Sequence, residues 1–270
     1  MSDLAEELSR LTYALRRTAR RRGALGLRRT AALPPPPVRE ARATEAFDRE
    51  TIRPQPPPPP KREAKQAPAP SPPATAQPSP AEIAARVGSL EELRTCVASC
   101  TACALSETRT QTVFADGLGT RRILFVGEAP GADEDRTGTP FVGRAGALVT
   151  DIITKGMRLS REDVYIANVL KCRPPGNRDP EPSEKALCTG WLDRQIELVD
   201  PLVIIPLGRH AACHVLGVEA PLGRLRGRVH DRDGRKVVPT YHPAYLLRSP
   251  GEKRKTWEDI QLAMREAGLS

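Results

Sequence analysis

The 270-residue chain has a formal net charge of +9 and no apolar run as long as a membrane span or the core of a signal peptide. We therefore expect a cytoplasmic protein, in which six cysteines are thiols or metal ligands and not structural disulfides. The charge is uneven, because residues 1 to 80 carry 15 basic and 8 acidic side chains, which leaves 27 against 25 for the remainder. The net charge therefore does not by itself indicate a nucleic-acid-binding domain.

The first 80 residues differ in composition from the rest of the chain. Residues 1 to 30 combine leucines at helical spacing with arginine pairs, which predicts a basic amphipathic helix. Such a helix could contact DNA phosphates, acidic lipid or a partner protein, or stay solvated without a specific target. Residues 31 to 80 hold 16 of the 28 prolines, which predicts a disordered, extended linker. We expect one folded domain over residues 81 to 270.

Four of the cysteines have spacings that indicate a metal site. Cys100 and Cys103 are separated by two residues, as in pairs of thiolates that bind one metal centre. Cys172 and Cys188 flank a loop rich in turn-forming residues and could complete the set. The spacing alone leaves zinc and an iron-sulfur cluster equally open.

The two other cysteines have different interpretations. Cys96 extends the first pair to the Cys-x3-Cys-x2-Cys spacing of radical S-adenosylmethionine enzymes. Those enzymes carry the triplet after a first barrel strand, whereas here it precedes the first predicted strand, and the chain is too short for their barrel. Cys213 lies in a helical pattern, so we interpret it as a small buried apolar residue.

The pattern of residues 81 to 270 predicts an α/β domain. Apolar or β-branched runs of strand length occur at residues 122 to 127, 164 to 169, 202 to 208 and 236 to 241. Helical patterns occur at residues 144 to 157, 183 to 199, 209 to 216 and 252 to 267. This alternation predicts a parallel sheet with helices on both faces.

Polar side chains follow three of the predicted strands. Ligands of open parallel sheets bind beyond the carboxyl ends of the strands, where Glu128, Asn168 and His242 are expected to converge. The glycine-rich loop after the first strand lacks both the phosphate-binding lysine motif and the dinucleotide fingerprint. A kinase or a nucleotide-dependent dehydrogenase is therefore disfavoured.

Four motifs together resemble one known family, the iron-sulfur or family 4 uracil-DNA glycosylases. They are the Cys100-x2-Cys103 pair, GEAPGADEDRTGTPFVGRAG at residues 127 to 146, NVLKCRPPGNRDPEPSE at residues 168 to 184, and HPAYLLR at residues 242 to 248. The resemblance implies a three-layer α/β/α sandwich with a four-stranded parallel sheet. It also implies a 4Fe-4S cluster, which favours iron over zinc, with the ligands Cys100, Cys103, Cys172 and Cys188.

The resemblance implies a role for each residue of the predicted pocket. An enzyme of this family rotates uracil out of the DNA stack, and Phe141 offers a ring on which the base can stack. Asn168 accepts from uracil N3-H and donates to O4, and His242 donates towards O2. Glu128 faces the sugar and the attacking water, and either orients that water or balances the charge of the oxocarbenium ion. Glu134 either excludes the methyl group of thymine or braces the loop.

Other residues are expected to support the site or to contact DNA. Asn177 matches a family position that supports the pocket. Leu247 and Arg248 lie in the segment expected to fill the gap left by the flipped base, and Arg226 is expected to contact phosphates. The expected substrate is uracil in single- or double-stranded DNA, bound by a monomer. The alternative is a non-catalytic DNA-binding or scaffold protein on the same fold.

Overall fold

The computed structural model describes residues 78–269, so the basic helix and most of the proline-rich linker predicted before them lie outside the described residues. The first described helix, α2 (Pro80–Arg86), begins with a capping box. The Ser79 hydroxyl accepts from the Glu82 backbone N–H at 3.3 Å, and the Glu82 carboxylate accepts from the Ser79 N–H at 2.7 Å. This cap sets the point where regular structure begins.

A five-stranded sheet forms the centre of the fold, in the order β2-β1-β3-β5-β4. Its strands are β1 (Ile123–Gly127), β2 (Tyr165–Asn168), β3 (Val203–Pro206), β4 (His230–Arg232) and β5 (Arg235–Val237). The first three and β5 are parallel, as predicted, and β4 pairs antiparallel with β5. The sequence analysis missed β4, because this three-residue strand is polar and half-exposed. Its connection to β5 turns through Asp233 and Gly234, both with positive φ.

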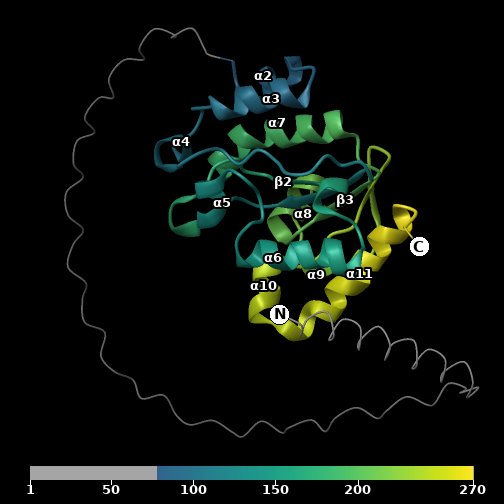
Figure 1. Cartoon of the computed structure of the whole chain (residues 1–270). Helices are drawn as coiled ribbons and strands as arrows, with labels where there is room; N and C mark the ends of the chain where they lie inside the picture. The colour runs from purple at the N-terminus through teal and green to yellow at the C-terminus, as the bar shows by residue number, and fades with distance from the viewer. Residues whose placement is uncertain (1–77, 270) are drawn as a thin grey trace, which may run out of the picture. The chain divides into compact units, whose positions relative to one another are not determined.

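Helices cover both faces of the sheet, which confirms the predicted α/β/α arrangement (Figure 1). One face packs against α7 (Pro182–Val199) and α8 (Arg209–Leu216), and α2 and α3 (Leu90–Ala98) pack in turn on α7. The other packs against α6 (Arg144–Asp151), α10 (Pro243–Arg248) and α11 (Lys253–Glu266). Successive β1 residues alternate between the two faces: Leu124 and Val126 face the first group, Ile123 and Phe125 the second. The strand is therefore buried on both sides, as its continuous apolar run predicted.

Short helical segments connect these layers and were not predicted. They are α4 (Leu105–Thr108), α5 (Ala132–Thr137) and α9 (Leu222–Leu225). The predicted helix at 144 to 157 is α6 followed by one π-helical turn, Ile152–Gly156. That turn ends at Gly156, where a Cβ atom would come within 2.7 Å of the Trp257 ring. Over the described residues, no helix combines the length and apolarity needed to cross a bilayer.

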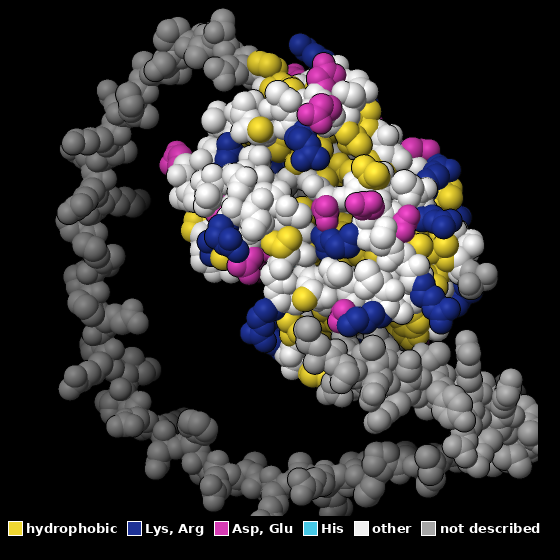
Figure 2. Space-filling model, viewed as in Figure 1, with side chains coloured by type: hydrophobic (Ala, Val, Ile, Leu, Met, Phe, Trp, Pro, Cys, Tyr) yellow, Lys and Arg dark blue, Asp and Glu magenta, His cyan; other side chains and the backbone are white. Residues whose placement is uncertain are grey.

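The surface carries charges of both signs. Figure 2 shows Lys, Arg, Asp and Glu side chains interspersed on the face drawn, with apolar side chains between them. This mixture agrees with the near balance of 27 basic and 25 acidic side chains in residues 81 to 270. Recognition of a charged partner therefore depends on local groups and not on one large field.

Candidate active site

The end of β1 brings an amide and an aromatic ring together. Gly127 pairs with Asn168 across the sheet, and a Cβ atom on Gly127 would lie 2.2 Å from Asn168 Oδ1 and 2.5 Å from Phe141 Cζ. Only glycine leaves room for both side chains. Asn168 is 2% exposed, and within the described residues its Oδ1 has no hydrogen-bond partner. A buried acceptor of this kind can be satisfied by an N–H group of a ligand.

The Phe141 backbone is held in an uncommon conformation. Its φ is +54°, which is unfavourable for a residue with a side chain. The Arg161 guanidinium donates to the carbonyls of Pro140 at 3.0 Å and Phe141 at 3.4 Å, and is itself paired with Asp116 at 2.5 Å. Gly146 allows the close approach, because a Cβ atom there would meet the Phe141 carbonyl at 2.0 Å. Sequence reasoning missed Arg161 and Asp116, which are 45 residues apart and belong to no motif.

His242 presents a neutral imidazole beside this ring. Its Nδ1 accepts from the Ala244 backbone N–H at 3.1 Å, and its ring centroid lies 6.2 Å from that of Phe141. Burial, followed by the charge of Arg248, lowers the pKa of His242 to about 4, although Glu134 acts in the opposite direction. At neutral pH the ring is therefore uncharged, and because Nδ1 accepts, the proton resides on Nε2. The structure places a hydrogen-bond donor at this position.

Glu128 follows β1 directly. Its side chain lines a cavity of about 360 Å³ between α7 and α8, and Phe141, Asn168 and His242 are not among the residues that line it. Burial, followed by the charge of Asp179, raises the pKa of the Glu128 carboxyl. Of the three side chains predicted to converge, Asn168 and His242 both lie beside Phe141, whereas Glu128, one residue beyond Gly127, lines the cavity between α7 and α8.

Glu134 braces the loop that carries Phe141. Its Oε2 accepts from the Gly131 N–H at 3.0 Å, and its Oε1 accepts from the N–H groups of Val142 and Gly143, each at 3.0 Å. These three bonds connect the two ends of the loop. They match the bracing alternative of the two roles considered for this residue, and a contact with a base stays a prediction.

The predicted DNA-contacting residues Leu247 and Arg248 are exposed near the C-terminal end of α10. Leu247 is 40% exposed, one of seven exposed large apolar side chains among the described residues. The helix begins directly after His242, so the exposed pair lies less than two turns from the imidazole. Asn177 is also exposed, and its Oδ1 accepts from Arg173 Nε at 2.8 Å, a contact within its own loop.

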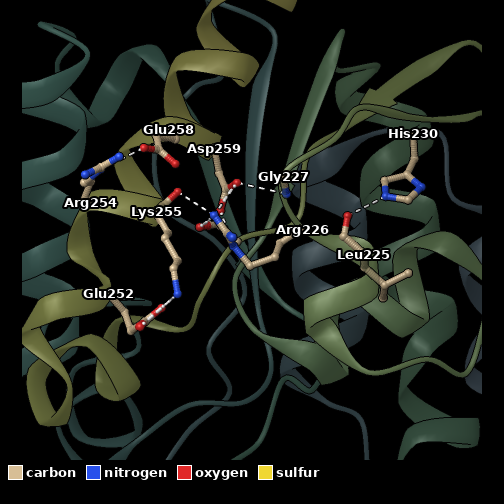
Figure 3. A network of polar contacts seen from close by, with 10 residues as sticks. Leu225, Arg226, Gly227, His230, Glu252, Arg254, Lys255, Glu258 and Asp259 are labelled. Carbon is tan, nitrogen blue, oxygen red and sulfur yellow. Dashed lines mark hydrogen bonds and ion pairs between the residues drawn. The ribbon is translucent and has the colours of Figure 1, made fainter. Parts of the chain in front are cut away.

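The guanidinium of Arg226 is engaged in contacts within the fold (Figure 3). It forms two hydrogen bonds with the fully buried Asp259, at 2.9 and 3.0 Å, and lies 4.9 Å from the centre of the Tyr241 ring. Its side chain is 14% exposed. This engagement argues against the predicted phosphate contact, because DNA would have to compete with a buried ion pair. Arg224 and Arg228 on either side of it are exposed.

The four predicted metal ligands surround one small cavity. Its lining includes Cys100, Cys103, Cys172 and Cys188, which come from the segment after α3, the segment after β2, and α7. Burial raises the pKa of Cys172, and that of Cys188 to about 12, so thiolates here need a compensating positive charge such as a metal. Arg109 Nη1 donates to Cys172 Sγ at 3.1 Å, a contact suited to a ligating sulfur.

A buried lysine adds to the fit for an anionic cluster. Lys171 is 1% exposed, and its ammonium donates to the Asn168 carbonyl at 2.7 Å and to the Gln195 side-chain oxygen. Both acceptors are neutral, so the ammonium group has no hydrogen-bonded carboxylate to balance its charge. The backbone N–H of Lys171 donates to Cys188 Sγ at 3.3 Å. Thiolates of a bound cluster would supply the opposite charge. Sequence reasoning missed Lys171, since lysine is almost never buried without a partner.

The other two cysteines lie away from this cavity. Cys96 is partly buried against the core and does not line the cysteine cavity. The Cys-x3-Cys-x2-Cys triplet of radical enzymes therefore does not form one metal site here. Cys213 is buried on α8, and its Sγ lies 3.5 Å from the Ala220 carbonyl, as expected of a small core residue.

Comparison with known proteins identifies the family. Residues 114–261 match the family model described as the uracil DNA glycosylase superfamily. A type-4 uracil-DNA glycosylase of Thermotoga maritima is 49% identical over 172 residues, which cover 62% of this chain and 88% of the relative. A type-4 enzyme of Archaeoglobus fulgidus is 45% identical over 64% of this chain and 90% of the relative. A type-5 uracil-DNA glycosylase of Pyrobaculum aerophilum is 32% identical over 54% and 70%.

The type-4 proteins match at higher identity and over more of their length than the type-5 protein of Pyrobaculum aerophilum. The family model spans more than half of the chain and covers the three strand ends that carry Gly127, Asn168 and His242. The chain therefore belongs to the uracil-DNA glycosylase superfamily and, within it, to the type-4 family.

Proposed function

We propose that this protein hydrolyses the N-glycosidic bond of uracil in DNA, releasing the free base and leaving an abasic site. The observation that carries the proposal is the group of side chains beyond β1 and β2, where a buried amide lies beside an aromatic ring and a neutral imidazole, and the amide oxygen has no hydrogen-bond partner among the described residues. Relatives of 49% and 45% identity are named as type-4 uracil-DNA glycosylases, which supports the same activity.

The pocket suits a uracil that has left the DNA stack. Phe141 supplies a flat apolar surface, and the rigid loop around it holds that surface in place. Asn168 Oδ1 accepts from N3-H of the base while the amide nitrogen donates to O4. Cytosine presents the reverse pattern, so it would leave buried polar groups unpaired.

Bond cleavage places negative charge on the departing base and positive character on the sugar. His242 donates from Nε2 to uracil O2 and stabilises the anion, in a site from which water is largely excluded. Glu128 accepts a proton from the attacking water. A carboxyl whose pKa is raised by burial is a better base than an exposed one.

The cysteine cavity is proposed to hold a 4Fe-4S cluster through Cys100, Cys103, Cys172 and Cys188. When bound, the cluster would cross-link the segment after α3 to the loop between β2 and α7. Arg173 in that loop would then be fixed near the DNA backbone, whereas Arg178 is paired with the buried Glu184 carboxylate. Strand preference, a monomeric state, a cytoplasmic location and a partner for the N-terminal segment stay predictions.

The test is incubation of the full chain with an oligonucleotide that contains one uracil, followed by hot alkali to cut abasic sites. Matched oligonucleotides carry thymine or cytosine at that position. We expect cleavage at uracil alone. Binding of the oligonucleotide without any cleavage by cluster-loaded protein would instead support the non-catalytic DNA-binding alternative.

A further inference from the structure

The cavity beside Glu128 contains a histidine, His210, that has no role in the proposed mechanism. His210, in the first turn of α8, points its Nε2 at Glu128 Oε1, 3.8 Å away, and at Asp179 Oδ2, 4.0 Å away. Its Nδ1 lies 3.1 Å from Lys185 Nζ on α7. Both His210 and Glu128 are largely buried, with side chains 21% and 26% exposed. Lysine, histidine and carboxylate thus form a chain across the cavity.

Lys185 determines which nitrogen of His210 carries the proton. An ammonium group has only donors, so in the neutral ring Nδ1 must accept and Nε2 must hold the hydrogen. Burial and the charges of Lys185 and Arg209 lower the pKa of His210, against the opposing effects of Asp179 and Glu219. The ring is therefore neutral at pH 7, with its single N–H directed at the Glu128 carboxylate.

The same side chains could be considered as a cation site, because ligand atoms of Glu128, Asp179 and His210 lie within 4.8 Å of one another. A metal would need the lone pair on Nε2, and the proton would then move to Nδ1, where it would face the Lys185 ammonium. Two donors would oppose each other at 3.1 Å. The lysine therefore favours a hydrogen-bond donor at Nε2 over a metal ligand.

We propose that His210, fixed by Lys185, is a positioning residue that orients the Glu128 carboxylate for activation of the hydrolytic water. This inference rests on the proposed glycosylase function. The His210 Nε2–H donates to one oxygen of the Glu128 carboxylate. The other carboxylate oxygen accepts a proton from the water while the water oxygen bonds to C1′. The C1′–N1 bond breaks, and its electron pair leaves with uracil. The present 3.8 Å shortens to a hydrogen bond when substrate closes the site, as catalytic contacts commonly do.

In this arrangement the general base Glu128 is oriented by His210, which is itself held by Lys185. Without His210, the Glu128 carboxylate would be free to rotate within a cavity of about 360 Å³. Its pKa would rise further, because the buried charge would lose its donor while Asp179 continued to repel it. Lys185 and Arg209 would remain, and their charges would continue to lower the pKa of Glu128.

The test compares His210→Leu with His210→Gln, whose side-chain amide nitrogen replaces the Nε2 donor. Single-turnover uracil release is measured from pH 5 to 9, together with DNA affinity and thermal unfolding. We expect the leucine variant to be about 10- to 100-fold slower, less than the roughly 10²- to 10⁴-fold contributed by a general base, because Glu128 itself remains. We also expect its acid limb to move to higher pH, its DNA affinity to be unchanged, and most of the rate to return in the glutamine variant.

Two further variants complete the experiment. Lys185→Met should slow release by a smaller factor, because His210 then loses its fixed tautomer, and Glu219→Gln, on the rim of the same cavity, should match the parent. Equal rates for the leucine variant and the parent, or equal losses with leucine and glutamine, would overturn the positioning role. An inactive parent protein would instead overturn the proposed glycosylase function on which the inference depends.

Discussion

The neutral state of His242 is the feature most open to measurement. Its pKa of about 4, against an ordinary value of 6.5, means that protonating the folded ring costs about 3 kcal/mol more than protonating an exposed one. At pH 7 about one molecule in a thousand would carry the imidazolium. The bond from the Ala244 N–H to Nδ1 leaves the proton on Nε2.

Nitrogen-15 NMR of the four histidines, with His242→Gln for assignment, reports both the tautomer and the pKa. We expect an Nε2–H ring that titrates near pH 4. In parallel, His242→Ala should lower single-turnover uracil release by about 10²- to 10³-fold while DNA affinity is retained. A ring that titrates near 6.5, a proton on Nδ1, or an unchanged rate would refute this account of leaving-group stabilisation.

The same pKa has a consequence for stability. Because the folded-state value is depressed, the unfolded chain binds more protons at this residue between pH 6.5 and about 4. Relative to its value above pH 6.5, the free energy of unfolding therefore decreases as the pH falls through this window. Between pH 7 and pH 5 the loss from His242 is about 2 kcal/mol. Urea unfolding at both pH values should show a smaller change in His242→Gln than in the parent.

Three further predictions follow from individual contacts. Asn168→Asp should reduce the uracil-over-cytosine ratio of kcat/KM by about 10²-fold, since a carboxylate cannot donate to O4; an unchanged ratio would contradict the amide assignment. Lys171→Met should lower the iron content and visible absorbance of the purified protein, and full cluster loading would contradict its role as counter-charge. Arg226→Ala should destabilise by about 3–5 kcal/mol in urea unfolding, because Asp259 is left buried and unpaired. Exposed Arg224→Ala should change stability by less than about 0.5 kcal/mol, and equal losses would show that the ion pair is unimportant.

The sheet was largely predictable because β1, β2 and β3 are buried on both faces. Continuous apolar runs marked these three strands, and the run predicted at residues 236 to 241 overlaps β5 only at its last two residues. The strand β4 left no such signal, since its residues are charged or half-exposed and it is defined by its pairing with β5. Polar edge strands depend on a turn and a neighbour, and neither is visible in hydrophobic periodicity.

The direction of the Glu128 side chain shows a different limit of sequence reasoning. The rule for parallel sheets correctly placed polar residues at one edge, but successive side chains along a strand point to opposite faces. The missing side chain of Gly127 leaves space for Asn168 and Phe141, and the side chain of the next residue, Glu128, lines the cavity between α7 and α8. The loop contacts of Arg161 also had no sequence signal, because they join segments through backbone carbonyls.

The strand end at Asn168 connects the proposed base pocket to the cysteine cavity within four residues. Lys171 donates through its side chain to the Asn168 carbonyl and through its backbone to Cys188 Sγ, and Cys172 follows it directly. Displacement of those sulfurs would therefore be transmitted to the amide that we propose distinguishes uracil from cytosine. Discrimination by hydrogen bonds requires that amide to be fixed within fractions of an ångström. A cluster at this point would serve base recognition by holding the amide in place.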